Sequence, residues 1–247
     1  MSKSGRINRQ PAFLLTSKPW RENSLWLEVF SREYGRVALL ARSARTRGSE
    51  LRGVLVPFVP FSASWFGKEE LKTLHRAEWL GGWPQPQNRS LFSALYANEL
   101  VYKLTAREDP QPRLFDLLHD TLAHICRHPA HAAALRRFEW GLLQENGLAP
   151  DTETDGNGNP LEAGALYRVS PESPVFPADG GSAPAGSLNV PGRVLQRLAS
   201  GALEGTEDLQ SALQLTRLLI DFRLPEGVKS RRLLQQLDYY REGLRGC

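Results

Sequence analysis

The chain has 247 residues, 41% of them hydrophobic, which is enough for one large domain or two or three small ones with ordinary cores. Two cysteines are too few for a disulfide framework, and the longest uncharged run, residues 53–67, contains two prolines and is too short to cross a bilayer. The polar N-terminus lacks the apolar segment of a secretory signal. These features exclude a disulfide-rich secreted protein and a membrane protein, and they predict a cytoplasmic one.

The net charge of +4 is distributed unevenly along the chain. Residues 1–80 contain 14 Lys and Arg against 7 Glu and no Asp, a net charge of +7, whereas the remaining residues carry 17 basic and 20 acidic side chains, a net of −3. A basic region on an otherwise mildly acidic chain is typical of a surface that binds phosphates, in nucleic acid or on a membrane. The alternative is that these cations only solubilise exposed strands.

Residues 11–80 have the pattern of β-strands. Short runs rich in Val, Leu, Phe and Trp are bounded by turn signals such as Lys18-Pro19 and Tyr34-Gly35. The runs lie at residues 12–17, 24–31, 36–43, 54–66 and 71–79. Five strands of this kind predict a small Greek-key barrel of the oligonucleotide-binding (OB) type.

From about residue 90 the apolar period changes to that of amphipathic helices. We expect helices within residues 91–104, 114–125, 135–143, 206–223 and 229–241, packed as a bundle. Residues 147–192 interrupt this pattern, because 8 Gly and 7 Pro in that segment cannot sustain a long helix or a central strand. Only residues 165–169 resemble a strand there. The fold class is therefore α+β, with a barrel at 1–82, helices at 83–146, a loop-rich insertion at 147–192 and further helices at 193–247.

Signatures of catalysis and metal binding are scarce in the sequence. No phosphate-binding loop, nucleophile elbow or zinc-protease motif is present, and the predicted barrel has no Asp that could hold metal for a nuclease. Cys126 ends an apolar helical stripe, where a buried thiol is the ordinary interpretation. His124 and His128 have the spacing of a metal-ligating pair, but a solvated helix end is the better interpretation. We predict no catalytic residue, no metal and no cofactor.

Six segments, taken in order, resemble the RecO family of bacterial recombination mediators. They are PAFLLTSKPWRENSLWLEVFSREYGRV, ARSARTRGSELRGVLVPFVPF, GKEELKTLHRAE, LYANELVYKLTAREDPQPRLFDLL, LRRFEWGLLQENG and VKSRRLLQQL. The resemblance implies an OB barrel, a helical domain and a zinc-ribbon-like insertion. It also implies binding of single- and double-stranded DNA, annealing of complementary strands, and partnership with RecR and with the acidic C-terminal tail of single-stranded DNA-binding protein. Many members bind zinc through four cysteines in the insertion, whereas residues 147–192 contain none, so zinc is not expected here.

The basic barrel and the resemblance together suggest a DNA-binding face. On an OB barrel, Arg and Lys hold phosphates while aromatic rings stack on bases. The candidate residues are Arg36, Arg42, Arg45, Arg47, Arg52, Trp65, Lys68, Lys72 and Arg76. Trp20, Trp26 and Phe66 are further candidate rings, although an aromatic residue in a small barrel more often belongs to its core.

The resemblance also suggests where an acidic tail that ends in Phe would bind. Such a peptide needs an apolar pocket for its ring and a guanidinium for its terminal carboxylate. The candidate residues are Leu135, Arg136, Arg137, Phe138 and Leu142, with Lys229 and Arg231 as weaker ones. The alternative is that Arg136 only pairs with Glu139 on the helix surface.

Two other functions stay open at this point. The chain could be a nuclease with an unrecognised active site, although the missing carboxylate and metal-ligand clusters argue against this. It could also be a scaffold whose basic barrel contacts acidic proteins or anionic lipid without a direct role on DNA.

Overall fold

The computed structural model describes residues 5–245, with the side chains of residues 5–237. Contacts divide the chain into two compact units. Unit 1 contains the residues up to Pro129 and those from Val228 onward, and unit 2 contains Ala130–Gly227. The division of the chain into four domains stays a prediction. The two compact units divide the chain at other positions.

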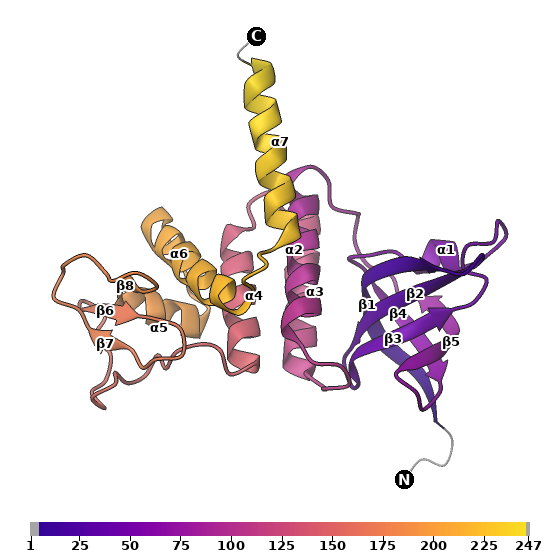
Figure 1. Ribbon diagram of the computed structural model, residues 1–247, viewed down its shortest axis with the longest axis horizontal. Coiled ribbons are helices and arrows are strands. Elements are labelled where there is room, and N and C mark those ends of the chain that lie inside the picture. Colours follow the sequence, from indigo (N-terminus) through magenta and orange to yellow (C-terminus); the bar gives the residue numbers. More distant parts are fainter. Residues whose placement is uncertain (1–4, 246–247) are drawn as a thin grey trace. The chain divides into compact units, whose positions relative to one another are not determined.

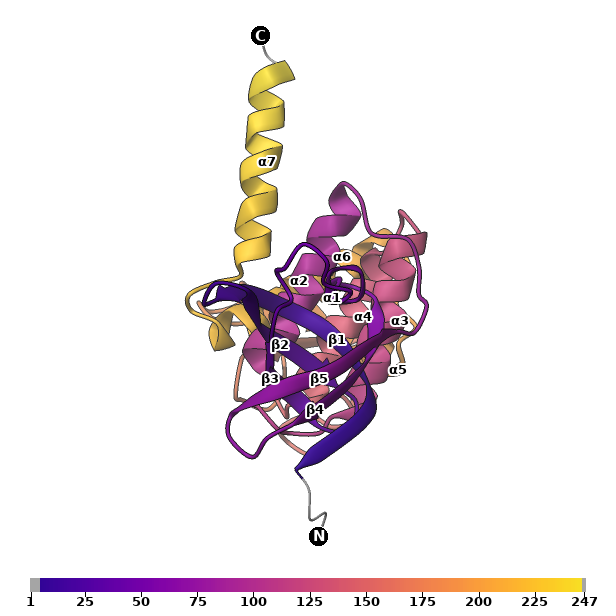
Figure 2. The same cartoon turned by 90° about the vertical axis from the view of Figure 1, so that its right-hand side faces the viewer.

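Unit 1 begins with a closed five-stranded barrel (Figures 1 and 2). Its strands are β1 (Arg6–Trp20), β2 (Ser24–Ser31), β3 (Gly35–Ala41), β4 (Pro60–Phe66) and β5 (Leu71–Trp79). They are paired in the order β1-β2-β3-β5-β4, and only the pair β3–β5 is parallel. The predicted OB-type barrel is therefore confirmed.

Alternation along the strands builds the barrel core. Leu27 and Val29 of β2 point inward together with Val37 and Leu39 of β3, and all four are buried. The strand predicted over residues 54–66 is partly wrong. Its first residue ends a short helix, α1 (Leu51–Val54), and β4 begins only at Pro60. The intervening segment contains a proline, which cannot donate to a strand ladder, and Phe58 in the left-handed region with φ of 72°.

Three helices belong to the same unit as the barrel: α2 (Arg89–Leu104), α3 (Pro112–Arg127) and α7 (Lys229–Arg245). The amide of Asn98 on α2 donates to the Leu14 carbonyl of β1 at 3.0 Å. Phe115 of α3 packs against Phe13 and Phe30 on the outer side of the barrel, with ring centroids 5.2 and 6.0 Å apart. Helices α2 and α3 therefore cover part of the outer face of β1 and β2.

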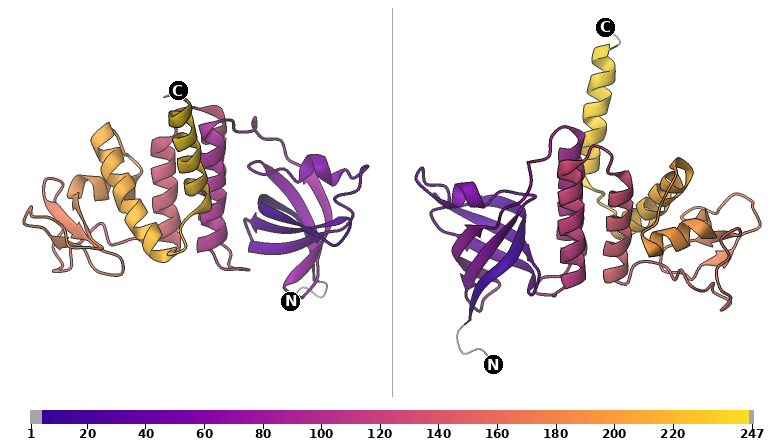
Figure 3. Two further views of the ribbon diagram at one scale, coloured as in Figure 1. Left: turned by 45° about the horizontal axis from the view of Figure 1, so that its top comes forward. Right: turned by 180° about the vertical axis from the view of Figure 1, so that it is seen from behind.

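Unit 2 combines three helices with a small antiparallel sheet (Figure 3). The helices are α4 (Ala132–Glu145), α5 (Gly192–Ser200) and α6 (Thr206–Arg223), and the strands are β6 (Leu166–Val169), β7 (Phe176–Pro177) and β8 (Leu188–Pro191). The five predicted helices are present, but α5 was missed. The expectation of a single strand in the insertion was also wrong, because β7 and β8 pair with β6 on its two edges.

The start of α5 depends on a glycine. A Cβ atom on Gly192 would lie 2.1 Å from the Glu162 carbonyl oxygen, so no other residue fits this close approach of two backbone segments. Glycine also ends the helix, because Gly201 has a φ of 71° at the C-terminal cap. Within the part of the chain that the structure describes, no helix is both long and apolar enough to span a bilayer.

Two aspartates organise the loop that precedes β6 in unit 2. Asp151 accepts hydrogen bonds from the Glu153 N–H and the Thr154 hydroxyl at 2.8 and 2.9 Å. Asp155 Oδ1 accepts the N–H groups of Asn157 and Asn159 at 2.8 and 2.9 Å. These bonds, led for Asp155 by that from Asn159, hold the pKa of both carboxyl groups below the usual 3.8. Carboxylates thus fix turns within the insertion.

Removing the Asp155 carboxylate is expected to destabilise unit 2 in a pH-dependent way. Because its pKa is lowered in the folded state, the carboxylate stabilises the fold above the unfolded-state value of 3.8, and this contribution is lost as the pH falls below that value. Asp155→Ala should lower the thermal midpoint by about 2–4 °C at pH 7. The difference from the unsubstituted protein should shrink below pH 3.8. The matched control is Asp179→Ala, at an exposed aspartate of the same insertion. It should change neither the thermal midpoint at pH 7 nor the dependence of the midpoint on pH.

Candidate nucleic-acid interface

Four of the predicted phosphate-binding residues lie together at one end of the barrel. Arg42, Arg45, Arg47 and Arg52 follow β3, are exposed, and form no ion pair with a carboxylate among the described residues. The Arg45 N–H donates to the Asn23 carbonyl at 3.0 Å, and its guanidinium donates to the Glu22 carbonyl at 3.1 Å. These bonds fix the segment to the β1–β2 turn. We call the four residues the arginine loop.

Two other predicted phosphate ligands are engaged within the protein. Arg36 forms an ion pair with Glu28 at 3.2 Å and donates to the Thr105 carbonyl, and Lys72 forms an ion pair with Glu108. The Glu108 N–H also donates to the Arg36 carbonyl at 2.9 Å. Both cations therefore fix the segment after α2 to the barrel. Both have a structural role, and their assignment to a DNA-binding face stays a prediction that would require these ion pairs to be exchanged for phosphate.

Lys68 and Arg76 lie apart from each other on the barrel. Lys68 is in the β4–β5 turn, and since β5 runs parallel to β3, this turn is near the start of β3, whereas the arginine loop follows its end. Lys68 is thus at the opposite end of the barrel. Arg76 is on β5, with its exposed side chain paired to Glu78 at 2.8 Å. The predicted residues do not form one continuous face.

The prediction that Trp65 stacks on bases is wrong. Its side chain is 1% exposed and belongs to the barrel core, where it contacts the Tyr34 ring edge-to-face at 5.4 Å. Trp65 has the same inward direction on β4 as Phe61 and Ala63, which places it inside. Among the residues of unit 1 whose side chains the structure describes, the exposed rings are Phe66, Trp79 and Tyr102. The last two were not among the predicted site residues. The position of Trp79, at a strand end shortly before Gly81-Gly82, could have indicated an exposed ring. The position of Tyr102 within a helix gave no such indication.

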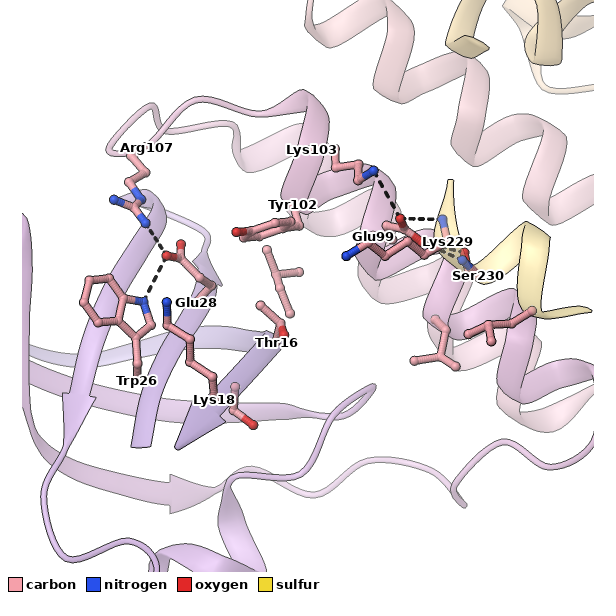
Figure 4. Close-up of a pocket in the computed structure, with 14 residues that line it drawn as sticks. Thr16, Lys18, Trp26, Glu28, Glu99, Tyr102, Lys103, Arg107, Lys229 and Ser230 are labelled. Carbon is pink, nitrogen blue, oxygen red and sulfur yellow. Dashed lines mark hydrogen bonds and ion pairs between the residues drawn. The ribbon is translucent and has the colours of Figure 1, made fainter. Parts of the chain in front are cut away.

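A pocket of about 450 Å³ opens between the outer face of β1 and β2, helix α2 and the start of α7, all within unit 1 (Figure 4). On the barrel side, Glu28 is buried and accepts hydrogen bonds from the Trp26 indole at 3.2 Å and from Arg107. The Lys18 ammonium lies 4.7 Å from the centre of the Trp26 ring. We call this cavity the junction pocket.

The helical wall of the junction pocket is fixed by Glu99 of α2. Its carboxylate accepts the N–H groups of Lys229 and Ser230 at 2.8 Å each, and Lys103 is 3.4 Å away. Partial burial by itself raises the pKa of Glu99, but the hydrogen bonds from Ser230 and Lys229 outweigh it and hold the pKa below the usual value. Glu99 is therefore ionised at neutral pH and attaches the N-terminus of α7 to α2.

The residues predicted to bind a peptide tail are mostly buried in unit 2. Phe138 and Leu142 are 0% exposed, and Leu135 is also buried. Arg136 is 8% exposed and donates to Glu139 at 2.6 Å, and Glu139 also accepts the Thr216 hydroxyl. The alternative pairing of Arg136 with Glu139 is therefore present, but in the interior.

These positions require a correction to the predicted tail-binding site. Buried Arg136, Phe138 and Leu142 offer no surface to a peptide, whereas Arg137 is exposed beside Gly201. The two weaker candidates belong to unit 1. Lys229 is exposed at the junction pocket, and the Arg231 guanidinium is 5.6 Å from the ring centre of Tyr96.

The Cys126 thiol and the possible metal ligands were two sequence candidates for a reactive site. Burial raises the pKa of the Cys126 thiol to about 11, so the thiol is protonated at neutral pH and is a poor nucleophile. Between residues 5 and 237, no three His, Cys, Asp or Glu side chains converge as a metal site would require. The exposed guanidinium groups of the arginine loop suit electrostatic binding of a polyanion.

Comparison with known proteins extends over both units. Residues 4–83 match the family model "Recombination protein O N terminal", and residues 88–232 match "Recombination protein O C terminal". DNA repair protein RecO of Neisseria meningitidis serogroup B is 57% identical over 235 residues, covering 94% of this chain and 89% of the relative. The Neisseria gonorrhoeae protein of that name is 58% identical, covering 94% and 95%. That of Thiobacillus denitrificans is 40% identical, covering 96% and 95%.

Proposed function

The chain belongs to the RecO family of DNA repair proteins, and we propose that it acts as a recombination mediator that binds single- and double-stranded DNA and anneals complementary strands. The family is not known for catalysis, and the proposed activity requires no covalent chemistry. The observation that carries the proposal is the arginine loop, four exposed guanidinium groups without carboxylate partners among the described residues, at one end of an OB-type barrel.

Electrostatics provides a physical route from this surface to annealing. Each phosphate that an arginine neutralises releases condensed counterions, which favours binding without reading sequence. Two complementary strands repel each other through the same phosphates, so a cationic surface that holds one strand lowers the cost of approach of the second. Base pairing then completes the reaction without hydrolysis of a nucleotide.

Two protein partners are part of the proposal. Family membership supports a complex with RecR and contact with the acidic tail of single-stranded DNA-binding protein, which together would help to load the recombinase on coated DNA. For the tail we propose Arg137 as the guanidinium ligand, because it is exposed, unlike its neighbours in the predicted set. We expect the protein to work in the cytoplasm, at the nucleoid.

An annealing assay tests the proposed function. Two complementary oligonucleotides, labelled with a donor and an acceptor dye, should anneal faster in the presence of the protein without ATP, including when the strands are coated with single-stranded DNA-binding protein. Unchanged annealing with both bare and coated strands would contradict the proposal. Binding to anionic vesicles in place of DNA would favour a scaffold instead.

A further inference from the structure

The junction pocket has a surplus of positive charge that its own carboxylates do not neutralise. Glu28 is already engaged by Arg36 and Arg107, and Glu99 by Lys103 and the start of α7. The ammonium groups of the other two lysines at the pocket, Lys18 and Lys229, pair with no carboxylate among the described residues. The pocket is thus prepared for an anionic ligand.

An aromatic ring also lines the junction pocket. Tyr102 of α2 lines the pocket, and its large ring is 38% exposed. The Arg36 guanidinium lies 5.1 Å from its ring centre and supports it by a cation–π contact. Figure 4 shows Tyr102 and Lys18 on opposite sides of the pocket, from α2 and β1. A ring on one wall of a pocket and cations on its walls suit a nucleotide, because the base can stack on the ring while the cations contact the phosphates.

Contacts along the barrel connect the pocket to the arginine loop. The loop is bonded to the β1–β2 turn through Arg45, and Trp20 at the start of that turn is 5.3 Å from Trp26 between ring centres. Trp26 in turn lines the pocket next to Lys18. A flexible polyanion could follow this path, whereas a short acidic peptide would use only one part of it. This continuity favours a nucleic-acid strand as the ligand.

We propose that the junction pocket holds one nucleotide of a bound single strand, with its base stacked on Tyr102 and its phosphates contacted by Lys18 and Lys229. This inference rests on the proposed DNA-binding function and adds a specific site to it. The volume of about 450 Å³ is within the range of small-ligand sites. The weaker assignment of Lys229 to a peptide tail is replaced by a contact with phosphate.

Substitution at Tyr102 tests the proposal by fluorescence anisotropy with labelled oligo-dT. Tyr102→Ala should weaken binding about tenfold, the effect of losing one stacked base, whereas Tyr102→Phe should bind like the unsubstituted protein. The matched control is Phe222→Ala in unit 2, since Phe222 is also an exposed ring, with the Arg223 guanidinium 5.5 Å from its centre. A thermal melt of each variant establishes that it is folded.

Substitution of the two exposed lysines gives a second test, which leaves Tyr102 and the packing of α2 unchanged. Lys18→Gln with Lys229→Gln should reduce the steepness with which log affinity falls against log salt by about 1.4, which is two phosphate contacts on a single strand. Photocrosslinking with an oligonucleotide that carries 5-iodouracil should give adducts on the peptides containing Tyr102 or Trp26.

The outcomes separate this inference from the proposed function. Suppose that the unsubstituted protein binds oligo-dT, that Tyr102→Ala and the double lysine variant bind it as tightly as the unsubstituted protein does, and that the crosslinks lie elsewhere. The pocket is then not a nucleotide site, and the proposed function stands. If the unsubstituted protein does not bind oligo-dT, the proposed function itself fails. Loss of binding to an acidic tail peptide in the lysine variant, with DNA binding unchanged, would assign the pocket to a peptide and overturn the inference.

Discussion

Replacing Arg42 and Arg47 by glutamate is expected to weaken binding of single-stranded oligo-dT by at least about tenfold at low salt, and to reduce the salt dependence of the affinity by about 1.4 in slope. Both guanidinium groups are exposed and form no ion pair among the described residues, so their removal leaves the barrel intact. Arg45 is a less suitable target, because its guanidinium also holds the β1–β2 turn through the Glu22 carbonyl. Anisotropy titrations over a range of salt concentrations measure both quantities.

A matched control separates local contact from overall charge. Arg113→Glu with Arg217→Glu changes the net charge by the same amount at two exposed arginines, one on α3 and one on α6. If the cationic end of the barrel binds the strand, this control should retain most of the affinity. Equal weakening in the two double variants would mean that only net charge matters and would contradict a defined binding surface.

The largest loss of stability is expected from Glu139→Ala in unit 2. Glu139 is 1% exposed and accepts hydrogen bonds from Arg136 and from the Thr216 hydroxyl. Its removal takes away the carboxylate partner of the buried Arg136 guanidinium. Breaking a buried pair in this way costs about 3–5 kcal/mol. Urea denaturation measures the change in the free energy of unfolding, and hydrogen exchange in residues 130–227 locates it.

Removing both charges should have a smaller effect than removing one. Arg136→Met with Glu139→Leu exchanges the ion pair for apolar side chains and should recover most of the lost stability, because no charge stays buried alone. A double variant as unstable as Glu139→Ala would show that the pair itself, with its bond to Thr216, stabilises unit 2.

The same pair determines how variants at the predicted tail site should be interpreted. Arg136→Ala removes the cationic partner of buried Glu139, so a loss of peptide binding in that variant would follow from damage to unit 2. Arg137→Ala is the cleaner test, because its guanidinium is exposed. We expect it to weaken binding of the tail peptide without changing the free energy of unfolding.

The elements with a regular apolar period could be predicted from the sequence. Residues 206–223 show a helical period, and α6 has those bounds; residues 24–31 alternate, and they form β2. Strands β7 and β8 have two and four residues, too few to establish a period, so the small sheet was missed. Helix α5 was missed because it begins at Gly192, at the edge of a Gly- and Pro-rich segment.

The site was harder to predict because its charges are paired over long distances in the sequence. Lys72 meets Glu108 and Arg36 meets the Thr105 carbonyl, so neither partner is near in the chain. A basic residue in a strand looks the same whether it faces solvent or a distant carboxylate. The arginine loop could be recognised because its cations gather in a short segment that contains a single acid, Glu50.

A titration of the unsubstituted protein with labelled oligo-dT at increasing KCl concentrations is the most direct test that the barrel end with the arginine loop binds a single strand. Four arginines and two pocket lysines predict tight binding at low salt and a log–log slope of about −4. Absence of binding at low salt, or an affinity that does not change with salt, would contradict the account.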